Sequence, residues 1–124
     1  MISKSDLESA LDDFTGSDNW YQHGVARHIT YTDGVKYLAD NAGAHWLVDK
    51  IATLQSVAKI KREEFQVWRL KVGKKNTAVL TCTDGGNGGP EREFHREKIE
   101  FTDFPLDEIT IWFTGNTILL PREY

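Results

Sequence analysis

Two histidines and two aspartates are the residues of this chain best suited to acid–base or metal chemistry. They are His23, His45, Asp33 and Asp49. An imidazole beside a carboxylate can move a proton or bind a cation, provided that at least two such groups converge in one pocket. His45 and Asp49 stand four residues apart on an expected helix, where such a pair is most often a plain surface interaction. A small enzyme or metal-dependent hydrolase built on these groups is therefore an alternative interpretation, and we assign no catalytic residue, metal ligand or cofactor.

Aromatic side chains stand beside ionisable ones in the segment after the first expected helix. Trp20, Tyr21 and His23 lie where regular structure is weakly indicated, and Tyr31 and Asp33 follow them. Loops with aromatic and ionisable side chains commonly carry binding. Trp20 taken alone fits the core better than a ligand-stacking role, but the group forms the best candidate binding surface of the sequence.

The segment 59–75 is basic within an acidic chain. Its seven lysines and arginines face two glutamates, a net charge of +5, whereas the whole chain carries −4. Arg69 and Lys71 are expected to project from one face of a strand, beside Phe65. Cations next to an aromatic ring can bind nucleic acid. Weak nucleic-acid binding is a second alternative, although the net negative charge argues against a general nucleic-acid binder.

Other groups with chemical potential have simpler interpretations. The glycine-rich segment 85–89 is followed by a proline and a charged strand, which indicates a hairpin tip because a phosphate-binding loop leads into a helix. Cys82 is the sole cysteine, so the chain has no intramolecular disulfide. Asp103, Asp107 and Glu108 indicate an acidic turn before a strand.

The first expected helix begins at a capping box. Ser5 is the expected N-cap and Glu8 can reach back three residues later. Apolar residues then recur from Leu7 to Phe14 at helical spacing, and Gly16 is expected to end the helix. Residues 25–31 are compatible with a short strand.

From Val35 onward, two apolar stripes of helical spacing lie on opposite faces. Either one helix is buried on both sides, or the chain breaks near residues 41–43. Asparagine and glycine are the residues that a helix C-cap uses, so we expect the break, with a second helix over about 44–58. Thr32, Asp33 and Gly34 form a turn or a helix start.

The remainder of the chain predicts strands. Residues 65–72 and 77–83 alternate in polarity around a tight turn, and residues 91–101 form a charged strand typical of a sheet edge. Residues 109–114 and 117–120 form a closing hairpin around Gly115 and Asn116. Because no helix separates these strands, we expect them to pair antiparallel.

Length and composition predict one domain that spans residues 1–124. Hydrophobic residues make up 40% and charged residues 27% of the chain, as in ordinary globular proteins. No segment approaches the ~18 apolar residues of a membrane span, and the first residues lack the pattern of a secretory signal. A cytoplasmic location is therefore expected.

Four runs of the chain look familiar together: 14–21, 31–39, 64–68 and 101–109. They resemble a family of small bacterial proteins of unknown function that also occur on plasmids and in phages, and the resemblance covers nearly the whole chain. T-D-G-V-K-Y-L-A and F-P-L-D-E-I are its most specific parts. The resemblance implies no activity and no site residues. It implies a small, stand-alone cytoplasmic protein of a mobile element, and such proteins often bind another macromolecule, including host defence machinery.

The sequence thus predicts an α+β domain: a short N-terminal helix and a broken helical segment packed on a four- to five-stranded antiparallel sheet. Expected core positions are Leu7, Leu11, Leu38, Trp46, Leu47, Ile51, Leu70, Leu80, Ile111 and Leu119. The favoured function is non-enzymatic binding of a macromolecule, with a protein as the expected partner, as in a modulator or inhibitor of host machinery. Its candidate binding residues are Trp20, Tyr21, His23, Tyr31, Asp33, Arg69 and Lys71.

Overall fold

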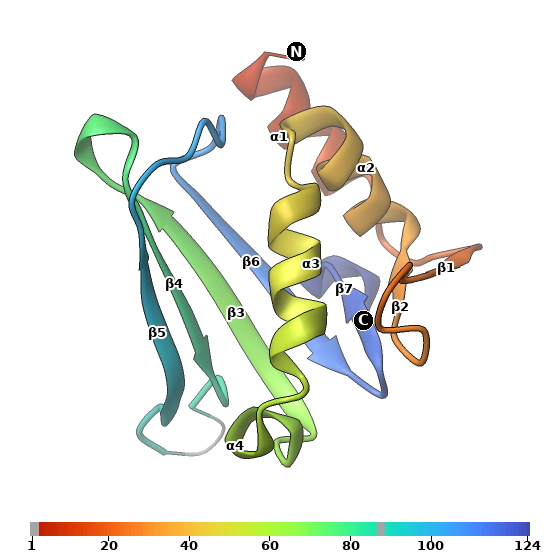
Figure 1. The fold of residues 1–124 in the computed structure, drawn as a ribbon. Coiled ribbons are helices and arrows are strands. Elements are labelled where there is room, and N and C mark those ends of the chain that lie inside the picture. Colours follow the sequence, from red (N-terminus) through yellow and green to blue (C-terminus); the bar gives the residue numbers. More distant parts are fainter. Residues whose placement is uncertain (1–2, 87–88) are drawn as a thin grey trace.

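The computed structural model describes residues 3–86 and 89–124, which form an α+β fold with helices packed on a twisted sheet (Figure 1). The helices are α1 (Lys4–Asp12), α2 (Asp33–Ala42), α3 (His45–Leu54) and α4 (Ala58–Lys61). The strands are β1 (Trp20–Gln22), β2 (Thr30–Thr32), β3 (Phe65–Val72), β4 (Ala78–Thr83), β5 (Glu93–Ile99), β6 (Glu108–Thr114) and β7 (Thr117–Leu119). Short 3₁₀ turns follow β3 at Lys74–Asn76 and β7 at Pro121–Glu123.

Within the described residues, seven strands form one sheet in the order β1-β2-β7-β6-β3-β4-β5. All neighbours are antiparallel except β2 and β7, which run parallel from Thr30 opposite Thr117. The predicted sheet of four to five antiparallel strands is therefore wrong in its strand number and at this pairing. β1 and β2 have three residues each, too few for alternating polarity to reveal a strand. The expected strand at 25–31 is a loop that enters β2 only at Thr30.

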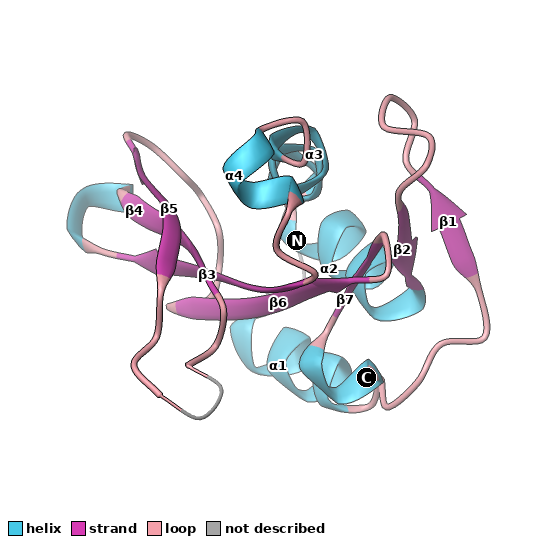
Figure 2. Ribbon diagram, turned by 90° about the horizontal axis from the view of Figure 1, so that it is seen from below, coloured by secondary structure: helices cyan, strands magenta, loops and turns pink. Residues whose placement is uncertain are grey.

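The two faces of the sheet are covered by different elements. Figure 2 shows α3 and α4 on one side of β3 and β6, with α1 and the C-terminal turn on the other. Trp68 and Leu70 of β3 are buried, and their partners across β6 are Ile111 and Ile109. The predicted alternation is confirmed from Trp68 to Lys71, whereas Gln66, Val67 and Trp68 are buried in succession. On the opposite face, Phe65 packs edge-on against Trp112 at 5.0 Å between ring centroids.

The helical segment breaks where the sequence predicts. Gly43 is the C-cap of α2 and has φ of +60°, a left-handed conformation that favours glycine. α3 ends at Leu54, earlier than the expected limit near residue 58, and α4 follows as a separate short turn of helix. The expected core position Trp46 is only half-buried, whereas the other nine expected core positions are buried.

The first helix begins two residues before the predicted start. Ser3 is the N-cap, and its hydroxyl accepts the Asp6 N–H at 3.2 Å, so the expected capping box at Ser5 is wrong. Serine can cap at either position, and sequence alone does not choose between them. α1 ends at Asp12, before Gly16. Its expected apolar stripe is confirmed in part, because Leu7 and Leu11 are buried.

The closing hairpin and the charged edge strand are confirmed. Gly115 and Asn116 both have positive φ, near 60°, as a two-residue turn between twisted strands requires. β5 forms one edge of the sheet and β1 the other. Among the described residues, no helix is long and apolar enough to cross a bilayer.

A buried glutamine pair joins α3 to the sheet. Gln55 and Gln66 exchange amide hydrogen bonds of 2.7 and 2.9 Å, and the Gln66 amide also donates to the carbonyl oxygens of Ile60 and Glu63. The Trp68 indole N–H donates to Gln66 at 2.9 Å. Gln66 is completely buried, so each of these groups depends on the others for its hydrogen bonds.

Replacing Gln66→Leu should lower the free energy of unfolding by about 3 kcal/mol, because it strands several buried polar groups at once. Urea unfolding followed by tryptophan fluorescence measures the change. In the double variant Gln55→Leu/Gln66→Leu, two of the stranded groups are removed together, so its loss should be smaller than the sum of the two single losses. A strictly additive double variant would contradict the assigned pairing.

Candidate functional site

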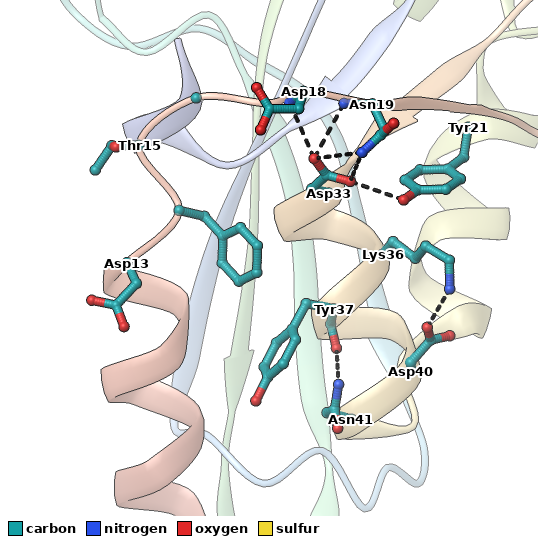
Figure 3. A pocket seen from close by; sticks show the side chains of 12 residues that line it. Asp13, Thr15, Asp18, Asn19, Tyr21, Asp33, Lys36, Tyr37, Asp40 and Asn41 are labelled. Atoms are coloured by element: carbon teal, nitrogen blue, oxygen red, sulfur yellow. Dashed lines mark hydrogen bonds and ion pairs between the residues drawn. The ribbon is translucent and has the colours of Figure 1, made fainter.

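The candidate site is organised by Asp33, the first residue of α2. Thr32 caps this helix, and its hydroxyl faces the Val35 N–H at 3.4 Å. The Asp33 carboxylate projects back over the loop that precedes β1 (Figure 3). Asp33, a predicted binding residue, therefore contacts a segment some fifteen residues earlier in the chain.

Five residues form what we call the Asp33 network: Ser17, Asp18, Asn19, Tyr21 and Asp33. Asp33 Oδ2 accepts the backbone N–H groups of Asp18 at 3.1 Å and Asn19 at 3.2 Å. Asp33 Oδ1 accepts the Tyr21 hydroxyl at 2.9 Å and the Asn19 side-chain amide at 3.3 Å. In return, the Asp33 N–H donates to the Ser17 hydroxyl at 3.0 Å. The loop before β1 is thus fixed from several directions.

These hydrogen bonds shift the pKa values of Tyr21 and Asp33 in opposite directions. The Tyr21 hydroxyl, followed by the backbone N–H of Asp18 and by Asn19, lowers the pKa of Asp33 despite partial desolvation. The same hydrogen bond to the carboxylate, with desolvation, raises the pKa of Tyr21. Asp33 is therefore a charged structural acceptor at neutral pH.

The Asp33 network leads directly into β1, where Trp20 stands in solvent. The Trp20 side chain is 59% exposed, so the expectation that it fits the core is wrong. The neighbouring Tyr21 points to the opposite face of the strand and stacks on Tyr31 of β2, with 5.6 Å between ring centroids. Lys36 lies 5.6 Å from the centre of the Tyr21 ring.

An open depression of about 710 Å³ lies between α1, α2 and the loop before β1 (Figure 3). Its carboxylates outnumber its cations: Asp13, Asp18, Asp33 and Asp40 against Lys36. Lys36 is bound to Asp40 at 2.6 Å, and this contact is the main cause of the lowered pKa of Asp40. The depression therefore carries a net negative charge and suits a cationic group.

His23 is a buried histidine with both ring nitrogens in use. Its Nδ1 accepts the N–H groups of Val25 at 3.2 Å and Ala26 at 2.9 Å, and its Nε2 lies 2.7 Å from Asp49 Oδ1. Because Nδ1 accepts two hydrogen bonds, the proton must sit on Nε2, which donates to Asp49. The ring is only 5% exposed. His23 thus holds the loop between β1 and β2 in place.

The expected pairing of His45 with Asp49 is wrong. His45 Nε2 contacts Asp40 at 2.9 Å, while Asp49 binds His23. His45 is the first residue of α3, and side chains on a helix lean toward its N-terminus, here toward α2. A pocket of about 120 Å³ nevertheless brings His23, His45 and Asp49 together, with Tyr31 beside them. Asp33 lines the other depression.

The basic residues do not form one surface. Arg69 and Lys71 lie on the outer face of β3, and Arg69 is ion-paired with Glu91. The remaining cations of the segment lie in or beside α4 and in the 3₁₀ turn after β3: Lys59, Lys61, Arg62, Lys74 and Lys75. The structure thus separates Arg69 and Lys71 from the other predicted binding residues.

Further candidates have structural surroundings. Cys82 is buried, and desolvation raises the pKa of its thiol to about 12, which makes the thiolate scarce at neutral pH. The predicted hairpin tip connects β4 to β5, with Asn87 and Gly88 outside the described residues. Asp107 binds Lys4 at 3.0 Å. Within residues 3–86 and 89–124, no cluster of three or more His, Cys, Asp or Glu could hold a metal ion.

Sequence reasoning missed a second contact at the start of α2. Glu123 Oε1 accepts the Thr32 hydroxyl at 2.6 Å and the Leu120 N–H at 2.9 Å, and its Oε2 accepts the Gly34 N–H at 3.1 Å. A Cβ on Gly34 would approach Glu123 Oε1 and Leu120 Cδ1 to 2.7 Å, so a larger residue would push these side chains out of their present contacts. The T-D-G run was visible in the sequence, but its distant partner was not.

The fold and the site define a small α+β protein whose mixed sheet ends in an aromatic edge strand fixed by a carboxylate. Residues 5–124 match a family of unknown function, DUF6876, and the chain belongs to this family. No curated protein and no solved structure matches the chain significantly. The near full-length extent of the predicted resemblance is confirmed.

Replacing Asp33→Asn should lower the pKa of Tyr21 toward its ordinary value of 10.0, because an amide no longer offers Tyr21 a charged acceptor. NMR titration of ring-labelled tyrosine measures this shift, with Asp49→Asn as the control that leaves Tyr21 unchanged. A Tyr21 pKa unaltered by Asp33→Asn would contradict the network.

The same network makes stability depend on pH. The lowered pKa of Asp33 means that its contribution is present above the ordinary carboxyl pKa of 3.8 and lost as pH falls through the folded-state value. The raised pKa of Tyr21 means that its contribution is present below 10.0 and lost as pH rises through the folded-state value. Asp33→Asn should flatten both limbs of the unfolding midpoint plotted against pH.

Two substitutions at His23 test whether its Nδ1 holds the loop between β1 and β2. Asparagine can place its side-chain oxygen near the Nδ1 position and accept the same backbone N–H groups, whereas phenylalanine cannot. His23→Phe should therefore be less stable than His23→Asn by about 1 kcal/mol. It should also speed hydrogen exchange at Ala26, as NMR would show. Equal exchange in both variants would mean that Nδ1 does not hold the loop.

Proposed function

We propose that this chain is a non-enzymatic binding protein that recognises a partner protein through the β1 surface, defined as Asp18, Trp20, Tyr21 and the outer edge of β1. One observation carries the proposal: Trp20 is 59% exposed on a strand whose entry is fixed by the Asp33 network. Tryptophan is enriched among the residues that dominate binding energy at protein interfaces.

The rigidity of the approach to Trp20 supports binding. Ordering a loop when a partner arrives costs conformational entropy and weakens the complex. Here the Asp18 and Asn19 backbone is already held by Asp33, and Tyr21 is held by both Asp33 and Tyr31. The backbone on both sides of Trp20 is therefore held in place before any partner binds.

The surroundings of the ionisable groups favour binding over catalysis. Both nitrogens of His23 are occupied, His45 is paired with Asp40, and Asp33 accepts hydrogen bonds on both oxygens. Cys82 is buried with a pKa of about 12. A general base or nucleophile needs a free lone pair that faces a substrate. His23 and Asp33 use theirs internally, and Cys82 is shut off from solvent.

The class of partner follows from the sequence resemblance. We propose a cytoplasmic component of host machinery, such as a defence system, because small proteins of plasmids and phages often modulate such targets. The chain then acts as a modulator or inhibitor by occupying a surface of its target.

A second candidate is a small hydrolase, which the shared pocket of His23, His45 and Asp49 favours. In that case His45 would exchange Asp40 for substrate, because its ring is the more accessible of the two, with a side chain 63% exposed. His45→Gln should then abolish hydrolysis of a panel of ester, phosphodiester and peptide substrates. Under the binding proposal, the wild-type chain and His45→Gln are equally inactive on all of them.

A photo-crosslinking amino acid at position 22, an exposed position of β1 on the same face as Trp20, tests the binding proposal while it keeps the tryptophan. In a lysate of the native host, it should trap one dominant protein partner. Trp20→Ala should weaken capture of that partner about tenfold or more without lowering the unfolding midpoint.

Phe101 supplies the matched control, since it is 69% exposed on a different segment. A crosslinker at position 101 should trap no such partner, and Phe101→Ala should leave capture unchanged. Equal labelling from positions 22 and 101, or none from position 22, would overturn the proposal.

A further inference from the structure

We infer that β1 receives an extended segment of the partner as an added strand, and that this segment carries an apolar residue next to a lysine or arginine. The inference rests on the proposed function and names the mode and chemistry of recognition. Three observations carry it: the direction in which the main-chain groups of β1 point, the composition of the two sheet edges and the charge of the depression beside Tyr21.

The hydrogen-bond phase leaves main-chain groups of β1 facing outward. The His23 N–H donates to Ile29 at 2.9 Å across the β1–β2 pair. In an antiparallel ladder, the main-chain N–H and C=O of every second residue face the partner strand. Those of Tyr21 therefore face Tyr31, whereas those of Trp20 and Gln22 face away from β2. The Thr30 N–H supports this phase, because it donates to Asn116 on the opposite side of β2.

The two edges of the sheet differ in protection. β5 carries Glu93, Arg96, Glu97 and Lys98, the charges with which natural proteins block strand addition. β1 reads Trp-Tyr-Gln and has neither charge nor proline. Among the described residues, no further strand pairs with β1 on its outer side. The edge that lacks blocking charges and proline is thus the one that carries the exposed tryptophan.

The side chains around β1 define what an added strand should carry. Trp20 and Gln22 point to one face of the sheet and Tyr21 to the other, so neighbouring residues of an added strand meet different surroundings. A residue on the Trp20 face packs against the indole. The next residue of the added strand lies on the Tyr21 face and reaches the depression lined by Asp13 and Asp18. This depression holds more carboxylates than cations, so it favours a cationic side chain. Both of these aspartates are exposed.

Selection from a phage-displayed library of short random peptides tests the inference without knowledge of the natural partner. Peptides enriched on the wild-type chain should carry an apolar residue directly next to lysine or arginine. Asp18→Lys should remove the preference for the basic residue, whereas Asp103→Lys, at an exposed site on another segment, should retain it. Enrichment that ignores charge at position 18, or no enrichment over bare support, would overturn the inference.

A matched pair of variants then tests the main-chain contact. Gln22→Pro removes the outward N–H, and proline is tolerated where a strand N–H faces solvent. Gln22→Ala removes only the side chain. Gln22→Pro should weaken binding of a selected peptide about tenfold, and Gln22→Ala should stay within about twofold of wild type. Equal binding to both variants would overturn strand addition.

N-methylation of the selected peptide gives a readout that needs no variant of the protein. Methylating successive backbone nitrogens should abolish binding at every second residue, because an added strand faces β1 with that period. A loss without this period would overturn strand addition even if Gln22→Pro fails to fold. If the crosslinker at position 22 still traps one partner, the proposed function stands while this inference fails.

Discussion

The first turn of α2 is the constraint on which the rest of the structure depends. Three consecutive residues of this turn bind segments that are distant in the sequence: Thr32, Asp33 and Gly34. Asp33 fixes the loop before β1, while Thr32 and Gly34 hold Glu123 of the C-terminal turn. The unpaired N–H groups at a helix start attract carboxylates. Here the start of α2 binds the carboxylate of Glu123 and also carries the carboxylate of Asp33, which binds the loop before β1. Loop, helix and C-terminal turn therefore share one junction.

The parts of the fold governed by local chemistry could be predicted from the sequence. The helix break at Gly43 and the turn at Gly115 follow from backbone conformations that glycine favours. Longer strands such as β3 announce themselves by alternating polarity. The parallel pairing of β2 with β7 could not be predicted, because it joins short strands from distant segments. The start of α1 was also open, since Ser3 and Ser5 are both competent caps.

The candidate site shows the same division. Composition alone singled out Trp20, Tyr21 and Asp33, because aromatic and ionisable residues gather there. The reason for their arrangement was hidden, since Asp33 binds backbone N–H groups, which every residue but proline possesses. Helical spacing suggested His45 with Asp49, but the position of His45 at a helix start turned it toward α2. Contacts between elements, which sequence periodicity does not reveal, determine these side-chain pairings.

The parallel pairing of β2 with β7 has a consequence for biosynthesis. β2 lies in the first third of the chain, yet the strand beside it and the carboxylate that binds Thr32 come from residues 117–123. During translation, the aromatic edge of the sheet therefore cannot settle into place until this late segment has left the ribosome. Contacts between distant segments also slow folding, because a long loop must close first. Until then Tyr31, which is partly buried in the finished fold, should be exposed on an unfinished sheet, where a chaperone could engage it.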